Sequence, residues 1–364
     1  MARILYGVMG NTHGHIMRTL SLVSRMPEHE FLFVGGGQVA KTLAALKKWK
    51  CVDVPVLRTV HRNQRVSVPR TIGQIVSCHL AVPRILDKLS RFIQTWQPDV
   101  AIVDREFFLP FAAQKYNLPT LSVDHSHVMK ACTYPVPPEE KTSWRLAMAN
   151  DYLFFDRTKH NLTVSFFHPP RSKPRKGVTD ELFPAVVREV VKTRTPSAGD
   201  HIFVYQTSPT FHRLIATLKE LKRPVIVYGF HDEDRVEGNV TFRAYHPERI
   251  LDDLASSAYA VVNGGHNLLS EAFYYGKPAL CFPVRTLFEQ FINAWHVREM
   301  GFGDYSTTMA PTAEIFSAFE AKLPEYQAAV KAKFREGTDE LVARMEHLIA
   351  NPREITPINN DRLN

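Results

Sequence analysis

The chain has 364 residues, of which 45% are hydrophobic and 23% charged, and its formal net charge is +8. This length accommodates two ordinary domains, and the composition excludes a disordered chain. The basic balance suggests an acidic partner, such as a nucleotide phosphate, an anionic membrane surface or nucleic acid, although a solvated basic surface without a partner would carry the same charge.

The first half of the chain alternates apolar, strand-like runs with stretches of helical spacing. Helices are predicted around 16–23 and 80–93, and strands are predicted at 3–9, 30–36, 51–57, 99–104 and 119–125. Continuous apolar strands separated by helices indicate a parallel sheet that is covered on both faces.

The stretch from 168 to 200 is rich in proline, glycine and basic residues, which predicts loop and linker. The alternation then restarts, with strands predicted at 201–208, 224–230, 240–245, 259–265 and 278–284. We therefore expect an α/β protein with two Rossmann-like domains, at residues 1–190 and 200–335. Residues 336–364 should form a helix and tail, with Thr338 as N-cap and an apolar face that packs back on the body.

A glycine-containing loop, GVMGNTHGH, lies where the first predicted strand ends and the first helix begins. In open α/β sheets ligands bind at this carboxyl edge, and the free N–H groups of a helix N-terminus favour an anion. The glycines Gly7, Gly10 and Gly14 do not match Gly-x-Gly-x-x-Gly, and no acidic residue follows the second strand. A dinucleotide-dependent dehydrogenase is therefore disfavoured.

Two histidines, His13 and His15, lie in this region, and Asp104 ends the fourth predicted strand at the same edge of the sheet. A carboxylate there could hold an imidazole in one tautomer and raise its basicity, as a general base requires. The alternatives are a solvated loop histidine and an aspartate that only caps a turn or helix.

The stretch VNGGHNLLSEAFYYGKP (262–278) repeats this strand–turn–helix arrangement in the second half. Gly264 and Gly265 allow a tight turn, and the N-terminus of the following helix would favour a phosphate. Glu271 lies inside the helix, where it could accept hydrogen bonds from sugar or ribose hydroxyls. Its alternative is an ordinary surface carboxylate.

The pair Glu289 and Gln290 falls in the predicted turn after the strand at 278–284. A carboxylate and an amide together offer acceptors and donors to vicinal hydroxyls. The Asp-x-Asp of HDEDR (231–235) could suggest a metal-dependent enzyme, but its mixed-charge surroundings favour a solvated turn, and no metal site is predicted.

The cysteines form no Cys-x-x-Cys, so neither a zinc site nor a disulfide framework is predicted for Cys51, Cys78, Cys132 and Cys281. The N-terminal stretch lacks the apolar run and cleavage site of a signal peptide, and no window approaches about 18 consecutive apolar residues. We expect a cytoplasmic protein, either free or in peripheral contact with the inner face of the membrane.

Together these motifs resemble the inverting glycosyltransferases of the GT-B fold, the superfamily of UDP-glycosyltransferases, macrolide glycosyltransferases and MurG-like enzymes. Its order of Gly-Gly-His-Asn, Glu, Gly-x-Pro, Glu-Gln, Asn-Ala and Gly-x-Gly is present in GGHNLLSEAFYYGKPALCFP and FEQFINAWHVREMGFG. The resemblance spans most of the chain. It departs in the glycine pattern of the first loop and in YQTSPTF (205–211), where the family's loop is glycine-rich.

The resemblance implies that the two domains face each other across a cleft, with the acceptor on the first, a nucleoside-diphosphate sugar on the second, and no cofactor. His15 would be the general base, with His13 as the second candidate, and Asp104 would orient it. A UDP-sugar is favoured as donor. Its diphosphate would lie at the turn Gly264–Gly265 and be bound by His266, Asn267, Leu268, Thr207 and Ser208. Glu271 would bind its ribose, and Glu289 and Gln290 would bind its sugar. Its nucleobase would lie at Ala244 and Tyr245.

The resemblance places the acceptor on first-domain loops, here 124–144 and 151–177, with His125 and His127 as candidate site residues. The acceptor is expected to be an alcohol of a lipid, a glycan or a small natural product. The second loop combines four phenylalanines with basic residues, which fits either a peripheral membrane contact or a buried strand pair beside a soluble basic loop. These residues are Phe154, Phe155, Phe166 and Phe167, with Arg171, Lys173, Arg175 and Lys176.

Three other functions fit parts of the sequence. A sugar-nucleotide 2-epimerase shares the two-domain architecture, and a non-catalytic sugar-nucleotide-binding subunit would retain the second-domain motifs. The His–Asp and Glu–Gln pairs favour transfer over the epimerase, and the His–Asp pair disfavours the non-catalytic subunit. A nucleic-acid-binding protein would explain the charge, but the basic residues are scattered and no recognition motif is present, so no nucleic-acid partner is expected.

Overall fold

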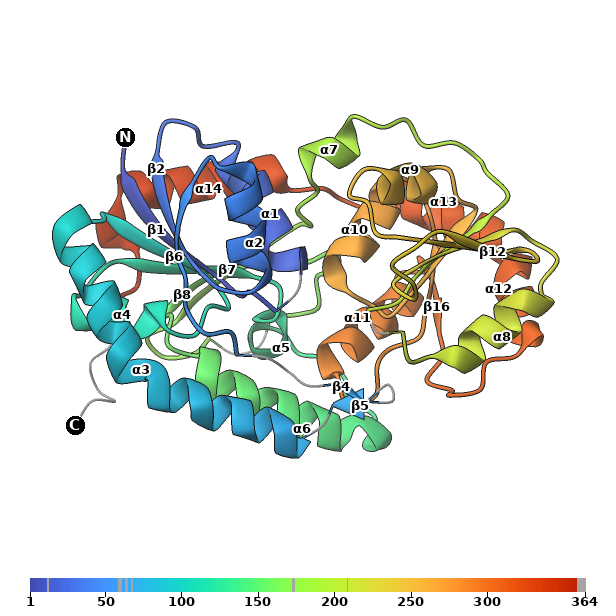
Figure 1. The fold of residues 1–364 in the computed structure, drawn as a ribbon, viewed down its shortest axis with the longest axis horizontal. Coiled ribbons are helices and arrows are strands. Elements are labelled where there is room, and N and C mark those ends of the chain that lie inside the picture. Colours follow the sequence, from blue (N-terminus) through green and yellow to red (C-terminus); the bar gives the residue numbers. More distant parts are fainter. Residues whose placement is uncertain are drawn as a thin grey trace.

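The computed structural model describes residues 1–11, 13–57, 61–62, 65–66, 68–171, 174–207 and 209–358, with residues 61–72 described by their backbone alone. Two seven-stranded sheets lie side by side, and helices surround each of them (Figure 1). A separate two-stranded ribbon consists of β4 (His61–Arg62) and β5 (Arg65–Val66). The predicted α/β class with two Rossmann-like units is confirmed.

The first sheet is parallel throughout and has the order β3-β2-β1-β6-β7-β8-β9. Its strands are β1 (Arg3–Val8), β2 (Glu30–Val34), β3 (Lys50–Val52), β6 (Val100–Asp104), β7 (Thr120–Asp124), β8 (His160–Val164) and β9 (Thr179–Phe183). The neighbours β1 and β6 end together, since Val8 pairs with Asp104. The segments that follow these two strands therefore start at one edge of the sheet.

The second sheet has the order β12-β13-β11-β10-β14-β15-β16 and is parallel except for β12 at its edge. Its strands are β10 (Ile202–Tyr205), β11 (Val225–Tyr228), β12 (Arg235–Glu237), β13 (Val240–Arg243), β14 (Tyr259–Val262), β15 (Ala279–Cys281) and β16 (Gly303–Tyr305). Tyr205 pairs with Val262, so the turns after β10 and β14 also start together.

Fourteen α-helices and three short helical turns connect the strands in the described part of the chain. They are α1 (His13–Val23), α2 (Gln38–Leu46), α3 (Val68–Trp96), α4 (Leu109–Lys115), α5 (Val128–Ala131), α6 (Lys141–Asn150), α7 (Glu189–Lys192), α8 (His212–Glu220), α9 (Arg249–Ala255), α10 (His266–Tyr274), α11 (Phe288–Glu299), α12 (Ala313–Ala321), α13 (Leu323–Lys333), α14 (Thr338–Ala350), η1 (Pro138–Glu140), η2 (Asp151–Phe155) and η3 (Pro352–Glu354). In Figure 1, α10 and α11 lie on the side of the second sheet that faces the first.

Two strands of the first sheet, β8 and β9, lie in stretches that we interpreted as an acceptor loop and as loop and linker. This interpretation was wrong for β9, whereas for β8 the alternative of a buried strand is confirmed. The polar side chains of the two strands satisfy one another inside the sheet. Asn161 donates to Asp180 at 2.9 Å, and His160 lies 2.9 Å from Glu181. The polar residues interrupt the apolar pattern that predicts a buried strand. Hydrogen bonds between neighbouring side chains compensate for the burial of these polar groups.

The C-terminal helix α14 packs on the first sheet, as predicted, although the chain reaches it from the second sheet. Leu341, Met345 and Leu348 are fully buried in the same core cluster as β1. Arg344 adds a hydrogen-bonded ion pair with Glu181 of β9. Thr338 is the first helical residue and not the N-cap; its hydroxyl accepts the N–H of Val187 at 3.2 Å.

The aromatic residues that we considered for a membrane contact are mostly buried. Phe166 and Phe167 are 2% and 1% exposed and join a core cluster that includes residues of both halves of the chain, and Phe155 is also buried. Phe166 contacts Phe273 of α10, with ring centroids 5.2 Å apart. These rings therefore hold the two halves together. Among the described residues, no helix is both long and apolar enough to span a membrane.

Candidate active site

His15 and Asp104 meet at the carboxyl edge of the first sheet. The Nδ1 of His15, in the first turn of α1, lies 2.7 Å from Oδ1 of Asp104, the last residue of β6. Because an ionised carboxylate only accepts, Nδ1 carries the proton of this bond, and Nε2 keeps its lone pair. The Asp104 side chain is 1% exposed and that of His15 21%, so the imidazole reaches solvent while its partner does not.

Arg18 is a third member of this group that the sequence analysis missed. Its Nη2 contacts both oxygens of Asp104 at 2.7 Å, and its side chain is only 4% exposed. Burial lowers the pKa of Arg18, but the Asp104 carboxylate outweighs this and raises it, so the guanidinium stays charged. Arg18 follows His15 by three positions on α1, which places both side chains on the same face.

The helix α10 begins directly at the turn predicted to bind a phosphate. Gly264 has a φ of +94°, and Gly265 precedes the helix without a side-chain cap. The N–H groups of His266, Asn267 and Leu268 have no hydrogen-bond acceptor among the described residues. The positive end of a nine-residue helix is therefore open at this point.

Asn263 fixes the loop that would cover this helix end. Its Oδ1 accepts the N–H of Thr207 at 2.8 Å and the Thr207 hydroxyl at 3.2 Å, and its Nδ2 donates to the carbonyl of Phe282. The predicted diphosphate ligand Thr207 thus lies beside the turn. The second predicted ligand from this loop, Ser208, lies outside the described residues.

The N-termini of α1 and α10 contact each other through Asn267. Its Nδ2 donates to the carbonyl of Gly14 at 2.7 Å, and its Oδ1 accepts from Nη1 of Arg18 at 3.3 Å. A second contact joins His13 to Tyr245, whose rings stack with centroids 5.5 Å apart. The base candidates and the donor candidates are therefore brought together across the junction of the two sheets.

His266 lies inside this junction. It is 5% exposed, and its ring stacks on His125 with centroids 3.9 Å apart. Burial lowers the pKa of His266 well below its usual value, and the positive charges of His125 and Arg18 act in the same direction. The imidazole is therefore neutral near pH 7, and its Nε2 has no partner in the described part of the chain.

The two acceptor candidates, His125 and His127, are both buried. The Nε2 of His125 lies 2.7 Å from Oδ1 of Asn293, a residue of α11. His127 pairs through Nδ1 with Asp124 at 2.7 Å, and its Nε2 has no partner among the described residues. His125 therefore connects the halves, whereas His127 and Asp124 form a second His–Asp pair at the edge of the first sheet.

Glu271 is buried and already engaged in an ion pair. Arg188, which precedes α7 on the crossing between the sheets, contacts it through Nε at 2.5 Å and Nη2 at 2.9 Å. The alternative of an ordinary surface carboxylate is therefore wrong. Each carboxylate oxygen retains a second lone pair, which leaves room for an additional donor such as a hydroxyl.

Glu289 and Gln290 lie in the first turn of α11 and not in the preceding turn as expected. Glu289 accepts a 2.5 Å hydrogen bond from the hydroxyl of Ser126, a residue of the first half. Gln290 is turned toward its own loop, where Oε1 accepts the N–H of Val284 at 3.0 Å. The structure thus brings Glu289 to the junction and uses the Gln290 carbonyl locally.

The loop proposed for the base of the donor has its own local bonds. The N–H of Ala244 donates to Asp234 at 2.9 Å, and its carbonyl accepts from Arg249 at 3.0 Å. Asp234 belongs to the Asp-x-Asp stretch and also forms an ion pair with Arg249. The Tyr245 ring, 47% exposed, is the part of this loop that faces the junction.

The chain is similar to known proteins in both sequence and structure. A family profile described as Glycosyl transferase family 1 matches residues 2–324. A curated protein of Methanosarcina mazei, named an uncharacterized glycosyltransferase, is 23% identical over 350 residues, which cover 86% of this chain and 89% of that protein.

Solved structures share the whole fold. The spinosyn forosaminyltransferase SpnP has a TM-score of 0.65 at 17% identity and covers 96% of this chain and 99% of its own. The Streptomyces sp. SF2575 glycosyltransferase SsfS6, solved in complex with thymidine diphosphate, has a TM-score of 0.59 at 15% identity and covers 95% and 100%. These likenesses confirm the GT-B architecture.

The turn before α10 allows a test of backbone strain with a matched control. A Cβ on Gly264 would lie 2.6 Å from the carbonyl oxygen of Gln290, and the positive φ is unfavourable for any L side chain. We expect Gly264→Ala to lower the free energy of unfolding by about 1–3 kcal/mol from the φ alone, with the clash adding to this.

Gly265→Ala is the control, because its φ is −68° and, apart from its chain neighbours, no atom of the described residues lies within 4 Å of its Cβ position. We expect it to lose less than about 1 kcal/mol. Urea unfolding of the two variants measures the difference. Equal midpoints would show that the turn does not depend on the conformation of Gly264.

Proposed function

We propose that this chain transfers a sugar, with inversion, from a nucleoside-diphosphate sugar to an acceptor hydroxyl. It belongs to the family described as Glycosyl transferase family 1 and is therefore a glycosyltransferase. The observation that carries this proposal is the His15–Asp104 pair, which faces an uncapped helix N-terminus across the junction of the two sheets. A UDP-linked hexose is the favoured donor, and no metal ion is required.

His15 is the general base of the proposed reaction. Its Nε2 takes the proton of the acceptor hydroxyl while the oxygen attacks the anomeric carbon, and Asp104 stabilises the imidazolium that forms. Attack from the face opposite to the leaving nucleotide inverts the configuration. The proton bound at Nδ1 stays there, because the 2.7 Å bond to a buried carboxylate fixes this tautomer.

The leaving diphosphate is stabilised by fixed dipoles. Its negative charge grows at the N–H groups of residues 266–268, which have no acceptor among the described residues. Donors that are already oriented cost no reorganisation when the bond breaks. The neutral His266 adds a hydrogen-bonding ring without a competing positive charge.

Arg18 links the two parts of the reaction. The same guanidinium contacts the carboxylate that orients His15 and the amide of Asn267 at the start of α10. It also shares the charge of the buried Asp104 carboxylate with His15. One side chain thus connects the group that orients the general base with the start of the helix that would receive the diphosphate.

Recognition of the donor would extend from α10 to α11. Glu271 binds the ribose hydroxyls while Arg188 holds its carboxylate in place. Glu289 binds the transferred sugar, whose hydroxyl takes the place of the Ser126 hydroxyl now bound to it. The nucleobase of the donor stacks at Tyr245, next to His13.

A panel of nucleotides tests the proposal. We expect UDP and UDP-sugars, added at about 100 times their Kd, to stabilise the folded chain by about 2.7 kcal/mol and to raise Tm by a few degrees. TDP is the second arm, because SsfS6 was solved with it. If no nucleoside diphosphate shifts Tm, the proposed function fails.

The same samples distinguish transfer from epimerisation and from binding alone. A transferase releases the nucleoside diphosphate when an acceptor alcohol is supplied, whereas a 2-epimerase converts the sugar nucleotide without one. A non-catalytic subunit would show the thermal shift and neither reaction. Coupled detection of released UDP and NMR of the recovered sugar nucleotide separate the three outcomes.

The assignment of the base is tested by His15→Ala with His13→Ala as the control. Loss of the general base should lower kcat by about 10²-fold or more while UDP binding is retained. His13→Ala removes only the ring that stacks on Tyr245 and should mainly weaken donor binding. A His15→Ala enzyme with near-normal turnover would transfer the role to another group.

We also propose that a peripheral membrane contact, if the acceptor is lipid-linked, uses the face formed by α3 and α6 with η2. His79 of α3 contacts Phe154 of η2, the segment that directly follows α6, with ring centroids 5.4 Å apart. Large apolar side chains are exposed there, with Leu80 at 79% and Leu153 at 68%. Basic residues flank them, namely Arg84, Lys88, Lys141 and Arg145.

Sedimentation with phosphatidylglycerol vesicles at low salt tests this surface. We expect the wild-type chain to bind the vesicles and the double variant Leu80→Asp/Leu153→Asp to bind about tenfold or more weakly. Each change removes apolar surface that the membrane would bury, and each new carboxylate is repelled by the anionic lipid. Val236→Asp is the control, because Val236 is 70% exposed at the edge of the second sheet. No sedimentation of the wild type would remove the membrane contact.

A further inference from the structure

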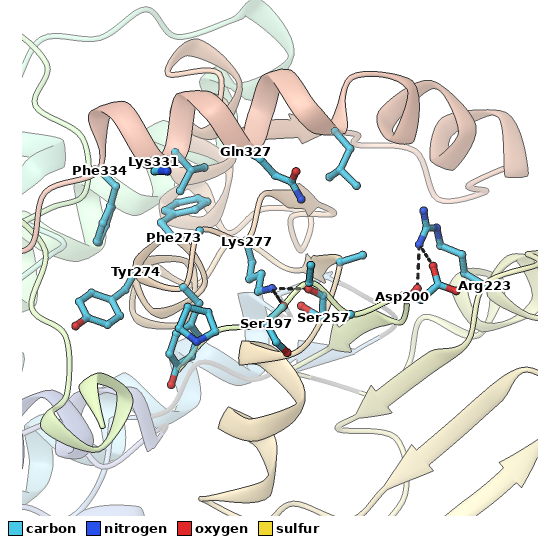
Figure 2. A pocket seen from close by; sticks show the side chains of 18 of the residues that line it. Ser197, Asp200, Arg223, Ser257, Phe273, Tyr274, Lys277, Gln327, Lys331 and Phe334 are labelled. Carbon is cyan, nitrogen blue, oxygen red and sulfur yellow. Dashed lines mark hydrogen bonds and ion pairs between the residues drawn. The ribbon is translucent and has the colours of Figure 1, made fainter. Parts of the chain in front are cut away.

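A cavity with a volume of about 860 Å³ lies away from the proposed active site. It is bounded by the crossing between the sheets at 196–200, by the C-terminal end of α10 and by α13 (Figure 2). The diphosphate site is at the other end of α10, roughly 13 Å away along the nine residues of the helix. We name this space the hinge cavity, because both chain crossings border it: Ala185 and Glu336, one from each crossing, form a β-bridge.

The charged groups of the hinge cavity do not balance. Its two carboxylates are already paired, Asp200 with Arg223 and Glu336 with Lys192 at 3.2 Å. Lys277 and Lys331 also border the cavity, and neither has a carboxylate partner among the described residues. Two ammonium groups therefore remain without a carboxylate partner, that of Lys277 buried and that of Lys331 exposed at the mouth of the cavity.

Lys277 is the more unusual of the two. It is 6% exposed, and its Nζ donates to the carbonyls of Ser197 at 2.5 Å and Ser257 at 2.7 Å, as the dashed lines in Figure 2 show. An ammonium has three N–H donors, so one has no acceptor in the described part of the chain. Burial lowers the pKa of Lys277 to about 8, which reflects a charge held without an anionic partner.

Aromatic rings form part of the wall, next to small and aliphatic residues. Phe273, Tyr274 and Phe334 border the cavity, and the rings of Phe273 and Phe334 have centroids 6.1 Å apart. Gln327 and Lys331 come from α13, on the side opposite the Ser197 and Ser257 carbonyls in Figure 2. Aromatic walls with a few polar groups are typical of small-molecule sites, and the volume lies in their usual range of about 300–1,000 Å³.

We propose that the hinge cavity binds an organic anion, a carboxylate, sulfonate or phosphate carried on an aromatic or alicyclic body. The body packs against Phe273 and Phe334, and the anionic group is bound by the ammonium groups of Lys277 and Lys331. A buried cation without a partner is unfavourable, and an anionic ligand supplies the missing charge. This proposal does not depend on the reaction proposed above.

Anilinonaphthalene sulfonate, an aromatic monoanion whose fluorescence rises on binding, is the probe. It is titrated into the full chain in the presence of excess UDP, so that the donor site is filled. Lys277→Met also removes the two bonds to the crossing and can loosen the fold, so Lys331→Met carries the test. Lys333→Met is the matched control, because Lys333 is on the same helix but donates to the carbonyl of Met300 at 3.1 Å.

We expect Lys331→Met to weaken probe binding about tenfold, as for the loss of one hydrogen bond to a charged group. Lys333→Met should bind like the wild type, and both variants should keep the UDP thermal shift. The uncharged analogue phenylnaphthylamine should bind the wild type more weakly and the two variants equally. Equal sulfonate affinities in Lys331→Met and Lys333→Met would overturn the proposal.

Discussion

The buried carboxylate of Asp104 is the constraint on which the site depends. A charge that is 1% exposed must be compensated, and here His15 and Arg18 share it from one face of α1. This requirement fixes where α1 starts relative to β6, because both partners come from its first two turns. Arg18 then reaches Asn267, so the position of α10 is set by the same carboxylate. The two halves are therefore aligned by polar contacts, with Phe166 and Phe273 as the apolar support.

Two of the carboxylates at this junction already have protein partners. Glu289 accepts a serine hydroxyl from the opposite half, in the way that it would accept a sugar hydroxyl. Glu271 is held by Arg188, which comes from the crossing between the sheets and so connects this residue to the relative position of the halves. Exchange of one hydroxyl for another conserves the hydrogen bond, so replacing Ser126 by a sugar hydroxyl leaves no buried acceptor unsatisfied.

The sequence predicted those features that depend on residues close together along the chain. Apolar runs gave the central strands of both sheets, and the turn chemistry around Gly264 indicated the start of α10. Arg18 was predictable as well, since its spacing of three from His15 puts both on one face. Arg188 and Ser126 were not, because their partners lie 83 and 163 residues away and meet them only when the halves dock. The strand β9 was missed, and a strand at β8 was only one of two alternatives, for a different reason: their burial depends on paired polar side chains such as Asn161 and Asp180.

The helix α10 shows how the fold separates two ways of attracting an anion. Its N-terminal end offers oriented N–H groups without a charged side chain of its own, so binding there depends on geometry and leaves His266 neutral. Beyond its C-terminal end the helix dipole is unfavourable for an anion, and attraction would have to come from the ammonium of Lys277. The two proposals thus assign to residues 266–277 a dipolar site, suited to a charge that develops during a reaction, and a cationic one, suited to a charge that is permanent. The difference follows from the direction of one helix between the junction and the crossing.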